Sequence, residues 1–305
     1  MTAIAVIGLG AMGSRIARRL LGAGLDVVVW NRTAGRLTEL AGLGAIPAAS
    51  PADAARRADA VITMVSDPPA LRDVIEGRGG VAAGVRDSAV VIQMSSVGPA
   101  AISWLSSALP PGTGLLDAPV LGSIAEAEAG SLRIFVGGPS ELIARWTPLL
   151  TVLGSPLPVG PLGAGSAAKL VANATLFGVL GVLGEAIALA HALGLPAATA
   201  FEVLATTPLA EQARRRRPSI ERGEYPPRFS LSLARKDAGL ILDAAAASGV
   251  DLRIIDAARS WLLEAEAAGL GDQDYSAMLA RIIQGRAGQQ PAGRERSATS
   301  EPPDR

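Results

Sequence analysis

The pattern of apolar residues changes near the middle of this 305-residue chain, and the change limits the folds open to it. In the first half, short β-branched runs alternate with amphipathic helical stretches. The runs cover residues 3–8, 26–30, 60–64, 89–94, 115–118 and 132–136, and the helical stretches cover 12–23, 36–42, 51–57, 99–109 and 140–153. This alternation predicts a parallel sheet with helices on both faces.

The second half shows helical periodicity alone. The stretches that show it are 164–193, 197–206, 231–248 and 252–268, with no convincing strand pattern between them. We therefore predict an α/β domain over residues 1–162 and an all-α domain over 163–285, joined by a long helix. Residues 286–305 are rich in Gly, Pro, Gln, Arg and Ser, a composition that predicts a disordered tail.

The composition excludes several classes of protein. The chain has no cysteine and one histidine, His191, so we expect no disulfide, no thiolate chemistry and no metal site. Positive and negative charges balance, and Glu211 and Glu221 flank the arginine run 214–217, which we interpret as a solvated helix end. We therefore expect no nucleic-acid partner. We also expect a cytoplasmic protein without a membrane span, because no signal peptide is evident and the apolar segment 164–195 carries charged side chains.

A glycine-rich turn follows the first predicted strand and opens the first predicted helix. It is formed by Gly8, Leu9, Gly10, Ala11, Met12 and Gly13. In this setting the first glycine allows a tight turn, the second lets a pyrophosphate approach the backbone, and the third permits close helix packing. The N–H groups and the dipole at the helix N-terminus favour a phosphate. The turn therefore predicts dinucleotide binding.

The end of the second predicted strand indicates which dinucleotide is bound. Proteins that bind NAD place an acidic residue there, on the ribose hydroxyls. This chain has Asn31, Arg32 and Thr33 instead. No carboxylate repels a 2′-phosphate, and the planar guanidinium of Arg32 can bind one. We expect these residues to hold NADPH in preference to NADH.

Only two of the 28 basic residues are lysines, Lys169 and Lys236. Arginine stays protonated in proteins, whereas a lysine in a desolvated site can give up a proton. Lys169 lies near the predicted domain boundary, where small substrates often bind. Asn173 follows four residues later, on the same face of a helix. We predict that Lys169 protonates a carbonyl oxygen during hydride transfer and that Asn173 holds the substrate and the lysine.

Six motifs occur in the order found in the β-hydroxyacid dehydrogenase family, which includes 3-hydroxyisobutyrate dehydrogenases and glyoxylate/succinic semialdehyde reductases. They are the glycine turn 8–13, Met64-Val-Ser-Asp67, Ser95-Ser96-Val-Gly-Pro99, Asp117-Ala-Pro-Val-Leu-Gly-Ser123, the segment from Gly163 through Lys169 to Asn173, and Lys236-Asp237. The chain resembles this family from about residue 2 to about residue 285.

The resemblance implies a fold, an activity and a set of site residues. The fold is a Rossmann domain joined by a long interdomain helix to a helical domain like that of 6-phosphogluconate dehydrogenase. That domain usually supports dimerisation, so we expect a homodimer, with a tetramer of paired dimers as the alternative. The activity is NAD(P)-dependent reduction of a small carbonyl compound such as a semialdehyde or keto acid, with Lys169 as proton donor and Asn173 on the substrate. The residues that would line the nicotinamide are Val65, Ser66 and Ser96, with Lys236 closing over it.

One position departs from the family's pattern. The family's loop reads Asp-Ala-Pro-Val-Ser-Gly, with the serine hydroxyl on the substrate carboxylate, whereas this chain has Leu121. The donors that remain at this predicted substrate site are the N–H groups of Gly122 and Ser123 and the Ser123 hydroxyl. A lost donor to a carboxylate costs about 1.5–3 kcal/mol, which favours a bulkier or less acidic carbonyl compound, or an imine. Alternatively, the backbone donors suffice and Leu121 is tolerated.

Three functions therefore stay open. The first is an NADPH-dependent carbonyl reductase. The second is an imine reductase with the same fold and cofactor; Leu121 favours it, and Lys169 opposes it because imine reductases usually carry Asp or Tyr at that position. The third is a non-catalytic NADP-binding interaction protein, which the presence of both Lys169 and Asn173 opposes.

Overall fold

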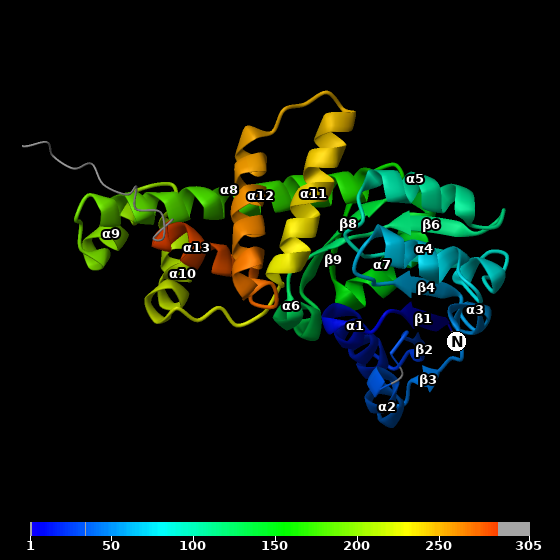
Figure 1. Ribbon diagram of the computed structural model, residues 1–305. Helices are drawn as coiled ribbons and strands as arrows, with labels where there is room; N and C mark the ends of the chain where they lie inside the picture. The colour runs from blue at the N-terminus through cyan, green and yellow to red at the C-terminus, as the bar shows by residue number, and fades with distance from the viewer. Residues whose placement is uncertain (1, 34, 286–305) are drawn as a thin grey trace, which may run out of the picture.

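The computed structural model describes residues 2–33 and 35–285, and the predicted tail, 286–305, lies outside the described residues. Within the described part, a nine-stranded sheet with helices on both faces forms one half of the molecule and a group of helices forms the other. Figure 1 shows the sheet domain at the lower right, the helical domain at the left and top, and α8 running across both. The predicted fold class, a Rossmann-like α/β domain followed by an all-α domain, is confirmed.

Parallel strands form the centre of the sheet in the order β3-β2-β1-β4-β5-β6. They are β1 (Ala3–Ile7), β2 (Asp26–Trp30), β3 (Ile46–Pro47), β4 (Ala60–Thr63), β5 (Val90–Gln93) and β6 (Gly114–Asp117). The residues of β4 and β5 are buried throughout because helices cover both faces of the parallel sheet. The strand order reverses between β1 and β4, and ligands bind at the carboxyl ends of strands beside such a point.

Further strands lead the chain out of the parallel sheet. They are β7 (Val120–Leu121), β8 (Leu132–Gly137) and β9 (Gly154–Gly160). β8 runs antiparallel to β6 and β7, and β9 runs parallel to β8. All six predicted strands are found within one residue of their expected bounds, whereas β3, β7 and β9 were not predicted.

Helices cover the two faces of the sheet and bury a hydrophobic cluster on each. One cluster joins the sheet to α1 (Ala11–Gly22), α2 (Gly35–Gly42), α6 (Ile124–Ala129) and α7 (Ser140–Leu153). The second joins the opposite face to α3 (Pro51–Arg56), α4 (Pro68–Glu76) and α5 (Pro99–Ala108). The glycine turn, at the N-terminus of α1, therefore lies at the carboxyl edge of a sheet that is buried on both sides.

The helical domain is built around α8. Its helices are α8 (Ala164–Ala192), α9 (Ala197–Leu204), α10 (Ala210–Arg222), α11 (Leu231–Ala247), α12 (Arg253–Ala265) and α13 (Met278–Gln284). α8 packs against β8 in the sheet domain and against α11, α12 and α13 in the helical domain. Phe177 lies in its buried face, and the Tyr275 ring meets the Phe177 ring edge-on with centroids 6.1 Å apart.

α8 is long and apolar enough to cross a membrane. Half of its most apolar window is buried inside the protein, however, and the buried face includes Lys169 and Asn173. The partners named above cover that face. We therefore interpret α8 as a core helix that connects the two domains.

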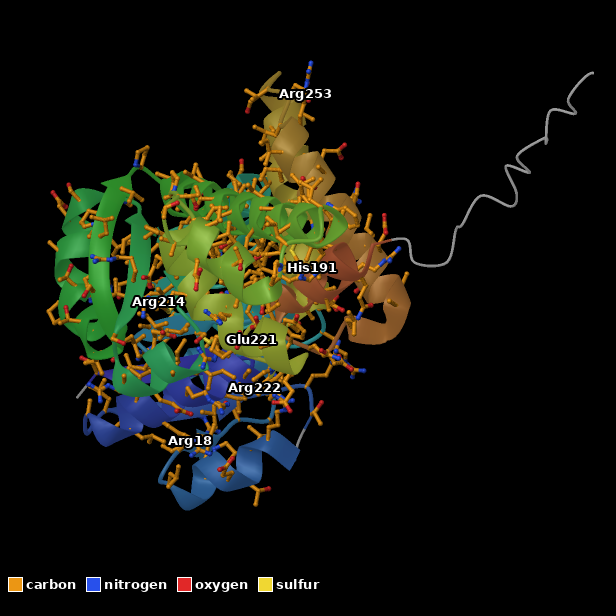
Figure 2. The ribbon with its side chains drawn as sticks, turned by 90° about the vertical axis from the view of Figure 1, so that its left-hand side faces the viewer. Arg18, His191, Arg214, Glu221, Arg222 and Arg253 are labelled. Atoms are coloured by element: carbon orange, nitrogen blue, oxygen red, sulfur yellow. The ribbon has the colours of Figure 1, made fainter. Side chains whose placement is uncertain are left out.

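The expectation of a solvated helix end at 214–217 is correct only in part. Arg214 is exposed on α10 and pairs with Glu211, on the face shown in Figure 2. Arg216 is buried instead, with Nη1 3.4 Å from Asp274 Oδ1 and Nη2 donating to the Tyr275 hydroxyl at 2.8 Å. The expectation was wrong for Arg216, because this side chain ties α10 to the segment before α13.

Candidate active site

The glycine turn has close backbone contacts on two sides and open space on the third. Gly8 has a φ of +94°, and a Cβ there would lie 2.3 Å from the Met64 carbonyl oxygen, just beyond β4. A Cβ at Gly13 would lie 1.9 Å from the Gly8 carbonyl oxygen, so only glycine lets α1 pack this closely on the turn. A Cβ at Gly10 would meet nothing within 4 Å. Leu9 is buried, and Ala11 and Met12 begin α1. The open N-terminus of α1 fits the pyrophosphate of a dinucleotide.

Asn31 connects the end of β2 to the glycine turn. Its Oδ1 accepts a hydrogen bond from the Leu9 N–H at 2.9 Å, and its Nδ2 donates to the Thr33 carbonyl at 3.0 Å. Arg32 is exposed and makes no hydrogen bond or ion pair with the other residues that the structure describes. Arg36 Nη1 donates to the Leu9 carbonyl at 2.9 Å, so a second guanidinium lies at this edge. Arg36 was not predicted as a site residue, and its position four residues after Arg32 was the available signal.

The residues that follow β4 and β5 form another part of the candidate site. The Val65 N–H donates to Ser95 Oγ at 2.8 Å and joins the two strand ends. The Ser66 hydroxyl donates to the carboxylate that caps α4. The Ser96 carbonyl accepts a hydrogen bond from Lys236 Nζ of α11 at 2.6 Å. The structure therefore brings Ser96 and Lys236 together across the two domains.

Lys169 and Asn173 lie one turn apart on the buried face of α8, with exposed fractions of 8% and 1%. Burial lowers the pKa of Lys169 to about 8; the charge of Asp237 opposes this shift and that of Lys236 adds to it. Lys169 Nζ forms no hydrogen bond or ion pair within residues 2–33 and 35–285. A lysine with this pKa exchanges its proton near neutral pH, which is the property of a general acid.

Asp237 of α11 contacts the neighbours of Lys169. Its Oδ2 accepts a hydrogen bond from Asn173 Nδ2 at 2.7 Å, and its Oδ1 lies 2.6 Å from Lys236 Nζ. Burial raises the pKa of Asp237, and the charges of Lys236 and Lys169 and the bond from Asn173 oppose that shift. Asp237 belongs to the Lys236-Asp237 motif, but its role was not predicted, because residues 64 positions apart show no pairing signal in one sequence.

Asp117, the last residue of β6, caps the first turn of α8. Its carboxylate accepts hydrogen bonds from the Ser166 N–H at 2.6 Å and the Ser166 hydroxyl at 2.8 Å. Burial raises the pKa of Asp117 to about 6, although both Ser166 bonds act to lower it. A Cβ at Gly165 would lie 2.2 Å from the Asp117 carbonyl oxygen, so helix and strand meet backbone to backbone. These contacts between Asp117, Ser166 and Gly165 hold the start of α8, the helix that carries Lys169, against β6.

The loop after β6 has fewer free donors than we expected. Leu121 ends β7 and is half-buried. The Ser123 N–H and hydroxyl both donate to Glu126 Oε2, at 2.7 and 2.6 Å, in a capping box at the N-terminus of α6. Gly122 has a φ of +140°, and a Cβ there would lie 2.8 Å from the Leu132 side chain. Both donors that we expected from Ser123 are therefore engaged within the protein.

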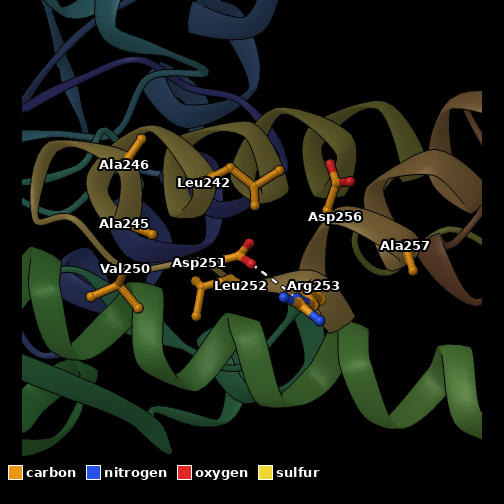
Figure 3. Close-up of a pocket in the computed structure, with 9 residues that line it drawn as sticks. All are labelled: Leu242, Ala245, Ala246, Val250, Asp251, Leu252, Arg253, Asp256 and Ala257. Atoms are coloured by element: carbon orange, nitrogen blue, oxygen red, sulfur yellow. Dashed lines mark hydrogen bonds and ion pairs between the residues drawn. The ribbon is translucent and has the colours of Figure 1, made fainter.

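A hollow at the turn between α11 and α12 lies apart from these residues. Figure 3 shows its lining of Leu242, Ala245, Ala246, Val250, Asp251, Leu252, Arg253, Asp256 and Ala257. Asp251 and Arg253 form an exposed ion pair at its rim, at 3.0 Å. None of the predicted site residues lines this hollow, so we do not assign the substrate to it.

Comparisons with known proteins identify the family. The model of the NAD-binding domain of 6-phosphogluconate dehydrogenase matches residues 3–166, and the model of the NAD-binding region of NADP-dependent 3-hydroxyisobutyrate dehydrogenase matches 163–282. The 3-sulfolactaldehyde reductase of Escherichia coli is 36% identical over 92% of this chain and 96% of its own length. Glyoxylate/succinic semialdehyde reductase 2 of Arabidopsis thaliana is 33% identical over 90% of this chain and 78% of its own.

A solved structure agrees with these matches. It is the 3-hydroxyisobutyrate dehydrogenase of Mycobacterium tuberculosis with L-serine, which is 29% identical, covers 92% of this chain and 99% of its own, and superposes with a TM-score of 0.80. The chain belongs to the β-hydroxyacid dehydrogenase family. It is an NAD(P)-dependent oxidoreductase that acts on CH–OH groups, so the expectation of an enzyme is confirmed and the non-catalytic alternative is set aside.

Proposed function

We propose that this enzyme reduces a small aldehyde or ketone with NADPH and that Lys169 is the proton donor. One observation carries the proposal: a buried lysine with a pKa near 8 lies beside Asn173 on the helix that joins the two domains. The nicotinamide of a bound cofactor supplies the hydride. Lys169 Nζ donates a proton to the carbonyl oxygen as negative charge develops there, and in the reverse direction the neutral amine accepts the hydroxyl proton. Asn173 holds the substrate.

The end of β2 supports NADPH over NADH. Arg32 is exposed and unpaired among the described residues, and Arg36 lies beside the glycine turn. Two guanidinium groups and no carboxylate favour a 2′-phosphate. In this proposal Arg32→Ala raises the KM for NADPH by about tenfold or more, the loss of a charged hydrogen bond, and leaves that for NADH nearly unchanged. Equal loss with both cofactors would remove Arg32 from the 2′-phosphate site.

The substrate end of the site supports a compound that does not depend on the Ser123 donors for its carboxylate. Leu121 supplies no donor, and Glu126 occupies both donors of Ser123. The relatives named above reduce 3-sulfolactaldehyde, glyoxylate and succinic semialdehyde. We propose a small aldehyde as the substrate, with the Gly122 N–H as the backbone donor at this loop. An imine is the second candidate, and Leu121 is the observation that favours it.

The first experiment follows NADPH absorbance with purified enzyme and a panel of substrates. The panel contains glyoxylate, succinic semialdehyde, methylmalonate semialdehyde, bulkier keto compounds and a cyclic imine matched to a ketone. Turnover of the small semialdehydes supports the proposal. Turnover of bulky ketones alone means that Leu121 marks a remodelled pocket. Turnover of the imine alone would replace the proposed carbonyl substrate with an imine, the second candidate.

The role of Lys169 is tested by Lys169→Met, which removes the acid and keeps an unbranched chain of similar length. Turnover should fall by about 10²–10⁴-fold, while NADPH binding, followed by nicotinamide fluorescence, stays near that of the unaltered enzyme. Turnover within a few-fold of the unaltered enzyme would exclude Lys169 as the proton donor.

A further inference from the structure

The Asn173 amide is held in one orientation. Its Nδ2 donates to Asp237 Oδ2 at 2.7 Å, whereas its Oδ1 is buried without a hydrogen-bond partner among the described residues. The contact with Lys236 Nζ favours the charged form of Asp237, and a carboxylate can only accept hydrogen bonds. The amide must therefore turn its NH₂ group toward Asp237 and its oxygen away. A buried, unpaired oxygen is unfavourable, so a donor is expected to reach it during function.

Lys169 is placed to be that donor. It lies four residues before Asn173 on the same buried face of α8, where side chains of this spacing are neighbours. Its ammonium carries three N–H donors on a flexible stem and forms no hydrogen bond in the described part of the chain. An ammonium that gives one N–H to a substrate oxygen can place a second on Asn173 Oδ1.

The charges around Lys169 come from few groups. Lys236 and Asp237, both on α11, act on it, and Asp237 is the acidic one. Asp117 on β6 faces the preceding turn of α8 and is bonded to Ser166. Glu185, farther along α8, accepts a hydrogen bond from Trp261 of α12. Asp237 therefore supplies the negative charge next to Lys169.

We propose that Asp237 is a positioning residue for the proton donor. It orients the Asn173 amide so that the amide oxygen is available to the Lys169 ammonium, and its charge favours the ammonium form. Asp237 acts through Asn173 and through its charge, and it does not touch the substrate. This inference rests on the proposed role of Lys169 as the general acid.

The scarcity of lysine allows a direct test that needs no substrate. Enzyme grown with lysine labelled with ¹³C at Cε gives signals from Lys169 and Lys236 alone, and Lys236→Arg assigns them. Titration of these signals reports the pKa of Lys169, which we expect near 8 in the unaltered enzyme. Asp237→Asn keeps an acceptor for Asn173 Nδ2 and removes the charge. In this variant the titration of Lys169 should move to lower pH, by about 1 pH unit or more, which is the usual effect of losing an opposite charge.

Asp243→Asn is the matched control, because Asp243 is an exposed aspartate on the same helix and makes no ion pair within the described residues. Its Lys169 signal should titrate as in the unaltered enzyme. An unchanged titration in Asp237→Asn, or an equal change in both variants, would overturn the proposal.

If Asp237→Asn does not fold, a second variant tests the proposal. Asn173→Leu keeps the Asp237 charge and removes the amide oxygen. It should also lower the pKa of Lys169, and an unchanged pKa there contradicts the role of Asn173.

The kinetics of reduction and of oxidation distinguish a specific effect of Asp237 on Lys169 from a general structural defect in the variant. Reduction needs the ammonium and oxidation needs the amine, so Asp237→Asn should lower kcat for reduction at pH 7.5. The ratio of kcat for oxidation to kcat for reduction should rise by about tenfold for each pH unit by which the pKa of Lys169 falls. A merely structural defect lowers both directions together. If the lysine signal moves but no carbonyl compound turns over, the proposed function fails, while the effect of Asp237 on the pKa of Lys169 stands. If turnover occurs and the signal does not move, the reverse holds.

Discussion

At the scale of single residues, burial brings the titration of one lysine close to neutral pH. Lys169 is 8% exposed, and burial lowers its pKa to about 8, so both protonation states are populated in the physiological range. In the mechanism proposed above, the ammonium form serves reduction and the neutral form serves oxidation. In that mechanism Lys169 makes the rate of each direction depend on pH, whereas the net direction still follows from the concentrations of substrate, product and the two cofactor forms.

The first prediction concerns this pH dependence. With saturating NADPH, kcat for reduction should be flat near pH 7 and fall by about tenfold per pH unit well above pH 8, because the ammonium is lost as pH rises through its pKa. The kcat for oxidation should depend on pH in the opposite sense and fall as pH drops below 8. Stopped-flow absorbance at 340 nm, in buffers of constant ionic strength, measures both. Limbs of the same sign in the two directions would contradict a lysine acid.

Asp117 gives a second prediction, on stability. Its pKa is raised from 3.8 to about 6 in the folded protein, so the folded state holds this proton more tightly than the unfolded state. Its contribution to the free energy of unfolding is therefore fully present below about pH 4 and lost as pH rises through 6. A pKa difference of about 2 between the two states corresponds to about 3 kcal/mol. The Asp117→Asn variant lacks this dependence and can still bond Ser166.

Urea unfolding at several pH values between 4 and 7 tests the prediction. The stability of Asp117→Asn relative to the unaltered enzyme should increase by about 2.4 kcal/mol from pH 4 to pH 7, because at pH 4 the unfolded-state carboxyl is already partly ionised. Asp243→Asn is the control, since that side chain is exposed and should leave the pH dependence unchanged. Parallel curves for Asp117→Asn and the unaltered enzyme would mean that Asp117 titrates at an ordinary value in the folded state.

At the level of elements, the loop that contains β7 and α6 already holds a carboxylate of its own. Glu126 supplies a carboxylate that already uses the Ser123 N–H and hydroxyl. Two hydrogen bonds from Ser123 lower the pKa of Glu126, so it stays charged. The loop is therefore stabilised by an internal carboxylate, and in the proposed function a substrate carboxylate needs donors other than those of Ser123.

Leu121→Ser restores the hydroxyl that the family carries at this place. It should raise kcat/KM for succinic semialdehyde by about tenfold, the value of one hydrogen bond to a charged group, and change that for the matching amide much less. Leu121→Ala removes the same bulk without adding a donor and serves as control. Equal gains in the two variants would show that side-chain volume, and not the missing hydroxyl, limits the substrate.

The elements that sequence reasoning found, and those it missed, differ in physical origin. The central strands were found because burial on both faces requires continuous β-branched runs. β9 was missed because Pro156 and Pro158 are typical of loops, and they are accommodated here in a strand that pairs only with β8. α10 was missed because it contains Pro218 and a run of arginines, and one of these, Arg216, contacts the distant Asp274. Such contacts between distant segments leave no periodic signal in one sequence.

The same distinction holds for the site. The glycine turn, Lys169 and Asn173 were predicted because local chemistry at fixed spacing identifies them. Two contacts were not predicted: that of Asn173 with Asp237 and that of Lys236 with Ser96. The helical domain brings these residues together only after folding.

At the scale of the whole molecule, α8 connects the two domains by packing against both. Its first turn is fixed to the sheet by Asp117, and its middle packs against α11 and α12. The face turned outward carries Val171, Val182 and Leu189, which are 67%, 47% and 59% exposed. Their spacings of 11 and 7 residues are close to three and two helical turns, so they form one apolar stripe along the helix.

We predict that a second copy of the chain covers this stripe, in the homodimer that the family resemblance implied. An exposed apolar stripe of this length is unfavourable for an isolated chain, and contiguous patches of this kind mark association surfaces. Sedimentation velocity at micromolar concentration should give about twice the chain mass of 30.9 kDa, or four times if dimers pair further. Val182→Glu places a charge in the middle of the stripe and should yield a monomer. Leu43→Glu, which changes a comparably exposed leucine just after α2, should leave the assembly intact.

The outcomes separate the alternatives for α8. A monomer for the unaltered chain, or a dimer that survives Val182→Glu, would mean that the stripe is not the contact between copies. Because Val182 lies 13 residues beyond Lys169, on the uncovered face, Val182→Glu should keep its turnover per chain if the site is complete within one chain. A monomer that loses turnover while its far-ultraviolet circular dichroism is unchanged would instead show that the partner copy is needed to hold α8, and with it Lys169, in the catalytic position.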